Sequence, residues 1–392
     1  MTTPLPAPDV AVVGGGLVGS ALAYELVVAG ADTVLVDRHD SGRATDAGAG
    51  ILSPETHQDP DPDTFALGMA SARHYPDLVA RLADDGAHES GFAVTGSLLV
   101  AERPGDDEIM ERAARLIAGR TPGLVDEVDP TEAARHFPPL GPVRRALFNP
   151  AGRRVDGRAL NAALREAAVA RGLRMVDASV DSLSLDRPRG KVDGVVTSEG
   201  PLAAGAVAVC GGAWSPELAD ALGVPVPVHP LKGQIVHLSL PGVDSRGWSI
   251  VQPVLGFYLV PWPDGRVACG GTMEADAGFD HRPTAGGLLQ LLREGLRTAP
   301  GLAQAAVTEV RVGLRPASPD GLPVVGRAPG WSNAYVATGH GAEGLLLGPL
   351  SARVLAGEIL GMAPADGPLE AGVPSRLLER WSPGRVGPGT GA

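Results

Sequence analysis

The feature that most constrains this chain of 392 residues lies near its start, where a short apolar run leads into three glycines. Residues 10–13 (Val-Ala-Val-Val) are too few for a helix and rich in β-branched side chains, which predicts a buried strand. Residues 14–19 (Gly-Gly-Gly-Leu-Val-Gly) then have the spacing G-x-G-x-x-G, and residues 20–29 are rich in helix formers. A second strand-like run, 33–36, ends at Asp37. This order predicts a dinucleotide-binding βαβ unit.

Each glycine of such a unit, and its terminal acid, has a physical task. Gly14 permits the tight turn, Gly16 lets the backbone approach a pyrophosphate, and Gly19 lets the helix lie close to the strand. The N–H groups of the first helical turn, which includes Leu17 and Val18, face the phosphates. Asp37 follows at the spacing expected of a ribose-binding carboxylate, which favours FAD or NAD over NADP. The alternative is a glycine-rich turn in another kind of α/β protein.

Bulk composition excludes several partners. The formal net charge is −12 and the sequence has no basic cluster, so nucleic acid and anionic membranes are not expected as partners. The two cysteines, Cys210 and Cys269, lie in apolar strand-like runs, which indicates no disulfide framework and fits a cytoplasmic protein. Residues 1–9 lack the features of a signal peptide, and residues 247–263, the longest uncharged run, contain prolines and predict strands rather than a membrane span. No metal site is expected.

The rest of the chain predicts a mixed α/β fold with an inserted domain. A run of small residues, 41–54, allows close approach of a flat ligand, although a flexible surface loop is the alternative. Residues 207–210 form a strand that leads into Gly211 and Trp214, and Trp214 is expected to pack rather than to catalyse. Strands between 235 and 271 alternate as in an antiparallel sheet, which indicates a second domain inserted into the first.

Other elements follow from periodicity and capping residues. A second strand, glycine turn and helix occur at the end of the chain, with the turn at residues 339–344, and its helix N-terminus is suited to stabilise negative charge on a ligand. The expected helices are 65–82, with a bend or restart at Pro76, and 106–119, 129–136, 155–171, 284–298 and 345–360. The further expected strands are 96–101, 173–176, 180–185, 192–197, 235–240, 249–253, 256–260, 266–271, 307–312 and 335–338.

Seven motifs, in order, resemble the D-amino acid oxidase superfamily of FAD enzymes, and most of all glycine oxidase of the ThiO type involved in thiamine biosynthesis. They are the glycine motif with Asp37, residues 45–51 (Thr-Asp-Ala-Gly-Ala-Gly-Ile), 258–261 (Tyr-Leu-Val-Pro), 270–273 (Gly-Gly-Thr-Met), 313–316 (Gly-Leu-Arg-Pro), 320–323 (Asp-Gly-Leu-Pro) and 338–340 (Thr-Gly-His). The resemblance covers about residues 9 to 362.

The resemblance implies a Rossmann-like FAD-binding domain with a parallel sheet, and an antiparallel-sheet α+β substrate domain that covers the flavin ring. We expect segments 9–82, 145–222 and 308–375 to form the FAD-binding domain, and segments 83–144 and 223–307 to form the substrate domain. Residues 376–392, rich in glycine and proline, are expected to be a mobile tail.

The resemblance also implies roles for individual residues. Arg315 would pair with the substrate carboxylate, for which a planar guanidinium is suited, although an ion pair between domains is the alternative. Tyr258 would lie beside the substrate, with a core tyrosine as the alternative, and Met273 and Ile51 would also contact the substrate. The expected cofactor contacts are Gly14, Gly16, Leu17, Val18, Gly19, Asp37, Arg38, Thr45, Ala47, Gly48, Ala49, Gly50, Ile51, Val180, Gly211, Trp214, Arg315, Gly339, His340, Gly341, Gly344 and Leu345.

Two features depart from related enzymes. Glycine oxidases often carry a second arginine just after the Gly-His of the C-terminal turn, whereas Gly341, Ala342 and Glu343 follow His340 here. Glu343 would then be solvated or meet a cationic substrate group. Sarcosine oxidases attach flavin through a cysteine before the Gly-Leu-Arg-Pro motif; no cysteine lies there, so FAD is expected to be non-covalent.

The expected reaction is oxidative deamination of a small amino acid or secondary amine of the glycine, sarcosine or D-amino acid type. A hydride would pass to flavin N5, the imine would be hydrolysed, and molecular oxygen would reoxidise the flavin to give hydrogen peroxide. No protein base is needed for a neutral amine, so His340 is expected to be structural. Alternatives are an amino acid dehydrogenase that uses an electron carrier, a tailoring enzyme of specialised metabolism, an NAD-dependent dehydrogenase and a non-enzymatic flavin-binding module. The oligomeric state, including a homo-oligomer, stays open.

Overall fold

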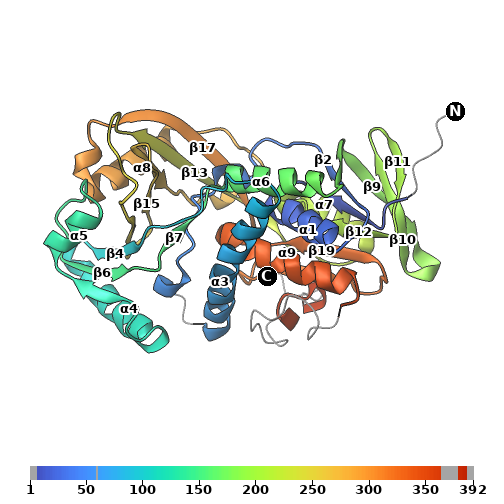
Figure 1. Ribbon diagram of the computed structural model, residues 1–392, viewed down its shortest axis with the longest axis horizontal. Coiled ribbons are helices and arrows are strands. Elements are labelled where there is room, and N and C mark those ends of the chain that lie inside the picture. Colours follow the sequence, from blue (N-terminus) through green and yellow to red (C-terminus); the bar gives the residue numbers. More distant parts are fainter. Residues whose placement is uncertain (1–6, 59–60, 363–377, 386–392) are drawn as a thin grey trace.

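Two large sheets lie side by side in the computed structural model, which describes residues 7–58, 61–362 and 378–385. The six-stranded sheet is on the right of Figure 1 and the eight-stranded sheet is on the left. Helix α3 (Pro62–Asp84) stands near the middle of this view. The arrangement agrees with the expected mixed α/β fold, which combines a Rossmann-like parallel sheet with antiparallel sheets.

The six-stranded sheet is built around the opening βαβ unit. Its order is β18-β19-β12-β1-β2-β8, in which all neighbours run parallel except β18, which is antiparallel to β19. Each strand residue of β1 and β2 is buried, as expected of strands covered on both faces. The strands are β1 (Val10–Val13), β2 (Thr33–Asp37), β8 (Arg174–Asp177), β12 (Ala206–Val209), β18 (Val324–Arg327) and β19 (Ala334–Thr338).

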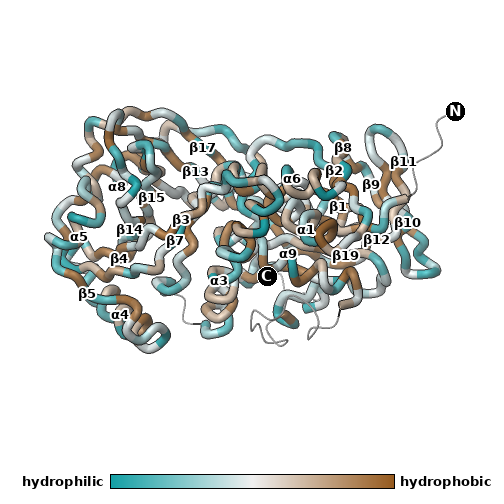
Figure 2. Tube along the Cα trace, in the orientation of Figure 1, coloured by the Kyte–Doolittle hydropathy of each residue, from teal (hydrophilic) through white to brown (hydrophobic). Residues whose placement is uncertain are grey.

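Different layers cover the two faces of this sheet. Val10 and Val12 of β1 belong to a core shared with α1 (Leu17–Val28), α3, α6 (Gly157–Ala170) and α9 (Gly344–Ile359). Ala11 and Val13 belong to a second core, shared with a three-stranded sheet, because successive strand side chains point to opposite faces. That small sheet has the order β11 (Gly200–Ala203), β10 (Lys191–Thr197) and β9 (Val180–Asp186). Figure 2 shows the apolar colouring of α1, which matches its buried position.

The eight-stranded sheet forms the other half of the molecule. Its order is β17-β13-β16-β15-β14-β4-β6-β5, and every neighbouring pair is antiparallel except β14 with β4. Apolar residues of α5 and α8 pack on one core of this half, and those of α4 on a smaller one. The strands are β4 (Ser97–Ala101), β5 (Asp126–Val128), β6 (Arg145–Asn149), β13 (His229–Ser239), β14 (Ile250–Pro253), β15 (Tyr258–Pro261), β16 (Arg266–Gly270) and β17 (Ala306–Ala317). The remaining elements are α2 (Ala44–Ala47), α4 (Asp107–Arg120), α5 (Pro130–His136), α7 (Ser215–Ala219), α8 (Ala285–Thr298) and the short pair β3 (Ala93–Val94) and β7 (Arg153–Arg154).

Helix boundaries follow the capping residues, with one correction. The side chains of Asp129, Asp156 and Thr284 accept hydrogen bonds from the first turns of α5, α6 and α8. Of the expected bend or restart at Pro76, the restart is wrong, because α3 continues through this residue as one helix. Its buried face, which includes Tyr75 and Leu78, offsets the hydrogen bond that proline removes.

Two of the predicted domain segments begin with strands of the other sheet. Segment 145–222 begins with β6, and segment 308–375 begins within β17, yet both strands pair in the eight-stranded sheet. The predicted strand 307–312 is also longer than expected, because β17 keeps its pairing with β13 as far as Ala317. The domain assignment as a whole stays a prediction.

The predicted mobile tail lies partly outside the described residues, at 376–377 and 386–392. In the described residues 378–385, Trp381 is buried in the core of the first half and its carbonyl accepts a hydrogen bond from Val325 N; the mobility of the tail stays a prediction. Within the described ranges, no helix is both long and apolar enough to cross a membrane.

Candidate cofactor and substrate site

A cavity lies between the two sheets. It is lined by loops at the carboxyl ends of β1, β2, β8, β12 and β19, and by residues of β13, β15 and β17 on the other side. The carboxyl edge of a parallel sheet is where open α/β folds bind ligands. The cavity therefore joins the nucleotide-binding loop to the eight-stranded sheet.

The glycine motif has the geometry that its spacing predicts. Gly14 has a φ of +103°, and a Cβ there would lie 2.6 Å from the carbonyl oxygen of Cys210. A Cβ on Gly19 would lie 1.9 Å from the carbonyl oxygen of Gly14, so only glycine lets α1 approach β1. Gly16 lines the cavity, and Leu17 N donates a 3.0 Å hydrogen bond to Thr45 Oγ1. The N-terminus of α1 thus faces the cavity beside the segment of small residues.

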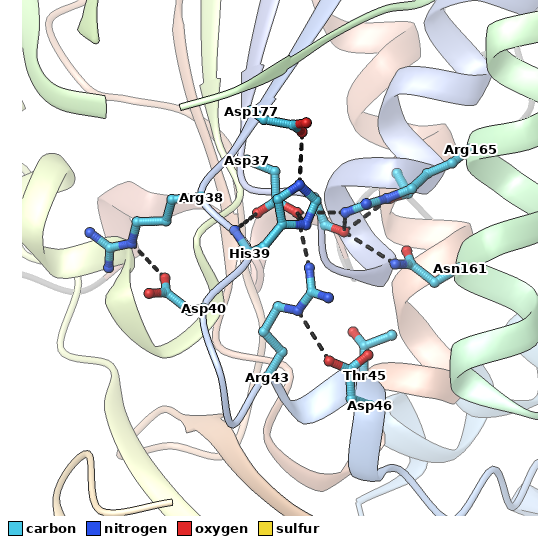
Figure 3. A network of polar contacts seen from close by, with 12 residues as sticks. Asp37, Arg38, His39, Asp40, Arg43, Thr45, Asp46, Asn161, Arg165 and Asp177 are labelled. Carbon is cyan, nitrogen blue, oxygen red and sulfur yellow. Dashed lines mark hydrogen bonds and ion pairs between the residues drawn. The ribbon is translucent and has the colours of Figure 1, made fainter. Parts of the chain in front are cut away.

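Asp37 lies in a network of cations at the end of β2 (Figure 3). Its Oδ2 accepts hydrogen bonds from Arg43 Nη1 at 2.9 Å and Arg165 Nη2 at 2.6 Å. Arg165 also donates to the carbonyl oxygen of Gly15, and Asn161 Nδ2 donates to the same oxygen at 3.2 Å. Burial alone would raise the pKa of Asp37, but the hydrogen bonds and positive charge of the arginines hold it below its usual value. The carboxylate is therefore ionised and fixed in place.

The small residues after Asp37 are required by packing as well as by the cavity. Gly50 has a φ of +80°, and a Cβ there would lie 1.7 Å from the carbonyl oxygen of Val155. A Cβ on Gly48 would lie 2.5 Å from Leu345 Cδ1. The segment is thus held between the start of α6 and the start of α9, which replaces the alternative of a flexible surface loop.

The second glycine turn closes the cavity from the side of α9. His340 is buried, its Nε2 lies 2.8 Å from Ser351 Oγ, and burial lowers its pKa to about 4. The imidazole is therefore neutral near pH 7, and the contact with Ser351 ties the turn to α9, which agrees with a structural role. Gly344 and Leu345, the first residues of α9, line the cavity.

Arg315 and Tyr258 lie together at the end of the cavity formed by the eight-stranded sheet. Arg315 Nη1 donates to the carbonyl oxygen of Thr272 at 3.0 Å and lies 3.4 Å from Met273 Sδ. No carboxylate of a described residue lies within ion-pair distance of Arg315, so the alternative of a domain-stabilising ion pair has no partner there. Burial raises the pKa of Tyr258 to about 12, so its phenol is neutral and able to donate a hydrogen bond.

Glycines make room for these two side chains. A Cβ on Gly233 would lie 2.2 Å from Arg315 Nη1, and a Cβ on Gly270 would lie 2.5 Å from the Tyr258 hydroxyl. A Cβ on Gly271 would lie 2.8 Å from that hydroxyl and 3.0 Å from Arg315 Nη2. The guanidinium of Arg315 and the phenol of Tyr258 therefore pack directly against the backbone of these three glycines.

Most of the expected site residues line this one cavity, and three do not. Gly19 lies behind the loop, where it permits helix packing; Gly339 adopts a φ of +76° beside Val324; and Met273 is 65% exposed, in contact with Arg315. The expected residues that line the cavity are Gly14, Gly16, Leu17, Val18, Asp37, Arg38, Thr45, Ala47, Gly48, Ala49, Gly50, Ile51, Val180, Gly211, Trp214, Tyr258, Arg315, His340, Gly341, Gly344 and Leu345.

Several cavity residues had no signal in the sequence. His57 and Gln252 line the cavity although they lie outside any recognised motif. His57 Nε2 lies 3.9 Å from Glu343 Oε2, so Glu343 is partly solvated and also faces a side chain of the site. Cys210 lines the wall at the end of β12, where burial raises the pKa of its thiol to about 12 and keeps it unreactive.

The comparisons with known proteins agree with this arrangement. Residues 9–358 match the family described as FAD dependent oxidoreductase (DAO). The crystal structure of iminodiacetate oxidase (IdaA) from Chelativorans sp. BNC1 is similar with a TM-score of 0.87 and 38% identity, over 95% of this chain and 98% of that chain. The uncharacterized oxidoreductase YurR of Bacillus subtilis (strain 168) is 37% identical over 353 residues, which are 89% of this chain and 94% of the relative. Glycine oxidase of Pseudomonas putida (strain KT2440) is 31% identical over 377 residues, which are 94% of this chain and 99% of the relative.

Proposed function

Because the chain belongs to the DAO family of FAD-dependent oxidoreductases, we propose that it oxidises a small amino acid or secondary amine at the carbon between the nitrogen and a carboxylate. The substrate types are glycine, sarcosine, D-amino acids and, from the likeness to iminodiacetate oxidase, amines that carry a carboxymethyl group. The observation that carries the proposal is the end of the cavity at the eight-stranded sheet, where Arg315 lines the site with no carboxylate partner among the described residues.

The residues of the cavity fit FAD. Gly16 and the first turn of α1 offer backbone N–H groups and no side chain, which suits a pyrophosphate. The ionised carboxylate of Asp37 suits ribose hydroxyls, and Arg43 and Arg165 hold this carboxylate in place. Glycines at 48 and 50 leave the main chain open to a flat ring. Cys210 is the only cysteine among the described residues that line the cavity, and burial raises the pKa of its thiol to about 12, which supports non-covalent binding.

Arg315 would anchor the substrate. Its guanidinium can donate two parallel hydrogen bonds to a carboxylate, which fixes the orientation of the adjacent carbon. Such orientation supplies a large part of the acceleration in a reaction between two bound groups. The neutral phenol of Tyr258 lies next to Arg315, and both pack against Gly271. This phenol would donate a hydrogen bond to an oxygen of the substrate carboxylate.

The protein need not remove a proton during oxidation of a neutral amine. His340 is unsuited to that task because it is buried, neutral and bound to Ser351. When bound, FAD would supply the redox chemistry, namely acceptance of a hydride from the carbon and transfer of two electrons to oxygen. The N-terminus of α9, at Gly344 and Leu345, offers N–H groups that would favour negative charge in the cavity. Water then hydrolyses the released imine to an oxo acid and ammonia or a primary amine.

The test is anaerobic bleaching of the flavin absorbance by a panel of glycine, sarcosine, iminodiacetate, D-amino acids and cyclic imino acids. We expect at least one member to bleach the wild-type holoenzyme, and Arg315→Ala to require a concentration at least tenfold higher for half-reduction. A panel without any effect, or an Arg315→Ala variant that matches the wild type, contradicts the proposal. Readmission of air separates an oxidase, which recovers its colour with release of hydrogen peroxide, from a dehydrogenase, which recovers it with an artificial acceptor.

A further inference from the structure

A cluster of polar residues lies behind the strand that carries the substrate end of the cavity. We name it the Glu274 cluster, after its central carboxylate. On β13, Gly233 and Ile235 line the cavity, whereas Lys232 and Gln234 alternate with them and lie outside its lining. The members of the cluster are Lys232, Gln234, Thr272, Glu274 and Thr284.

Hydrogen bonds and an ion pair join Thr272, Gln234 and Lys232 to Glu274, and Thr284 is bound to Gln234. Glu274 Oε1 accepts from Thr272 Oγ1 at 2.6 Å and from Gln234 Nε2 at 2.7 Å. Its Oε2 lies 3.5 Å from Nζ of Lys232, a residue that is only 1% exposed. Burial would raise the pKa of Glu274, but these hydrogen bonds and the Lys232 charge hold it below its usual value. A buried ammonium is costly without a counter-charge, so Glu274 and Lys232 are bound to each other.

The main chain is fixed by the same residues. Thr272 N donates to the Gln234 carbonyl at 3.1 Å, and Glu274 N donates to the Lys232 carbonyl at 2.9 Å. Gln234 N in turn donates to Thr272 Oγ1 at 2.9 Å. Residues 272–274 are therefore held against β13 by side-chain and backbone contacts together.

Residues 272–274 contact Arg315, at the substrate end of the cavity, through the carbonyl oxygen of Thr272. The carbonyl oxygen of Thr272 accepts the 3.0 Å hydrogen bond from Arg315 Nη1. The guanidinium of Arg315 also packs against Gly233 of β13, the strand that carries Lys232 and Gln234. Gly233 has no Cβ, and this leaves room for the guanidinium. The position of Thr272 thus sets one of the directions in which Arg315 donates.

We propose that Glu274, with Lys232 and Gln234, is a positioning group for Arg315: it fixes the Thr272 carbonyl, which orients the guanidinium toward a substrate carboxylate. The inference rests on the anchoring role of Arg315 in the proposed function. Loss of the Glu274 carboxylate removes side-chain contacts that hold residues 272–274 and leaves the backbone hydrogen bonds to β13, so the Thr272 carbonyl is held less firmly and Arg315 samples other orientations. The affinity for a carboxylate should therefore fall by a larger factor than kcat, the turnover rate of the enzyme–substrate complex.

The test is a double-mutant cycle on the holoenzyme with glycolate, a carboxylate without an oxidisable amine, titrated against the flavin spectrum. Glu274→Ala and Arg315→Lys should each weaken binding about tenfold, and the double variant should be hardly weaker than Arg315→Lys alone. With an amine that is turned over, Glu274→Ala should raise KM about tenfold and change kcat less. Asp276→Ala, which removes an exposed carboxylate two residues further along, is the matched control and should leave the Kd unchanged.

The outcomes separate the two proposals. If Arg315→Lys does not weaken binding, the anchoring role itself fails and the positioning role fails with it. If Arg315→Lys weakens binding but the two effects add, or if Glu274→Ala binds glycolate as the wild type does, only the positioning role is wrong. Should Glu274→Ala not retain FAD, Glu274→Gln takes its place in the cycle, since it keeps one oxygen acceptor; its effects should again be non-additive with Arg315→Lys, and additivity would overturn the positioning role.

Discussion

Arg165 Nη2 lies 2.6 Å from Asp37 Oδ2, and this contact joins helix α6 to the end of strand β2 across 128 positions of sequence. The same guanidinium donates to the carbonyl oxygen of Gly15 in the glycine motif. One side chain thus holds the acidic residue and the loop of the opening βαβ unit in a fixed relation, at the place where the cofactor phosphates and ribose would lie.

Replacement of Arg165 should weaken FAD binding. Arg165→Leu removes a charged hydrogen bond to Asp37 and positive charge near the loop, so we expect the Kd for FAD to rise at least tenfold. Titration of the apoprotein with FAD, followed by flavin fluorescence, measures this change. Arg171→Leu is the matched control, because Arg171 follows the last residue of α6 and pairs with Asp85, and neither residue lines the cavity. Equal affinity of the two variants contradicts the expected role.

A methyl group on Gly233 should displace Arg315. A Cβ there would lie 2.2 Å from Arg315 Nη1, so Gly233→Ala forces the guanidinium to move while the nucleotide half of the cavity stays intact. We expect KM for the amine to rise at least tenfold with normal FAD content, because a misplaced anchor loses substrate orientation. Gly286→Ala, where a Cβ would meet no atom within 4 Å, serves as the control for steady-state kinetics. An unchanged KM in Gly233→Ala is the contrary result.

His340 should make folding stability depend on pH. Burial lowers the pKa of His340 to about 4 from the ordinary value of 6.5, so the unfolded chain takes up a proton first as the pH falls. The stability that the neutral imidazole contributes is therefore fully present above about pH 6.5 and is lost as the pH falls toward 4. Denaturant unfolding at a series of pH values measures the free energy of unfolding as a function of pH. In this window, that free energy should fall less steeply with falling pH in His340→Gln than in the wild type, by an amount that corresponds to up to about one bound proton. If the free energy of unfolding varies with pH in the same way in both proteins, His340 does not contribute this pH dependence.

Trp381 should fasten the C-terminal segment to the first half of the molecule. The residue is 1% exposed, and its carbonyl accepts from Val325 N in β18. Trp381→Ala should lower the free energy of unfolding by about 3–5 kcal/mol, the usual cost of truncating a buried aromatic side chain. Chemical denaturation measures this difference, and Glu379→Ala, on the same segment, should change it by less than about 0.5 kcal/mol. A loss no larger than that of the control indicates that the segment is dispensable for stability.

Local spacing predicted the features that act through neighbouring residues. The glycines at 14, 16 and 19 and the acid at 37 were identifiable because a strand, a turn and a helix are fixed by residues close in sequence. The helices expected at 129–136 and 155–171 were found for the same reason, because the side chains of Asp129 and Asp156 cap their first turns. Continuation of α3 through Pro76 was missed, since it depends on what the helix packs against.

The sequence by itself determined the βαβ unit and, through its resemblance, the family and the arginine that would meet a substrate. Only the tertiary structure decided which charged residues lie together: Arg165 beside Asp37, His57 beside Glu343, and Lys232 beside Glu274. These pairs are brought together by sheet register and helix packing. The partner of a charged side chain is the opposite charge that lies near it in space. The periodicity of the sequence does not indicate which distant residues the fold brings that close.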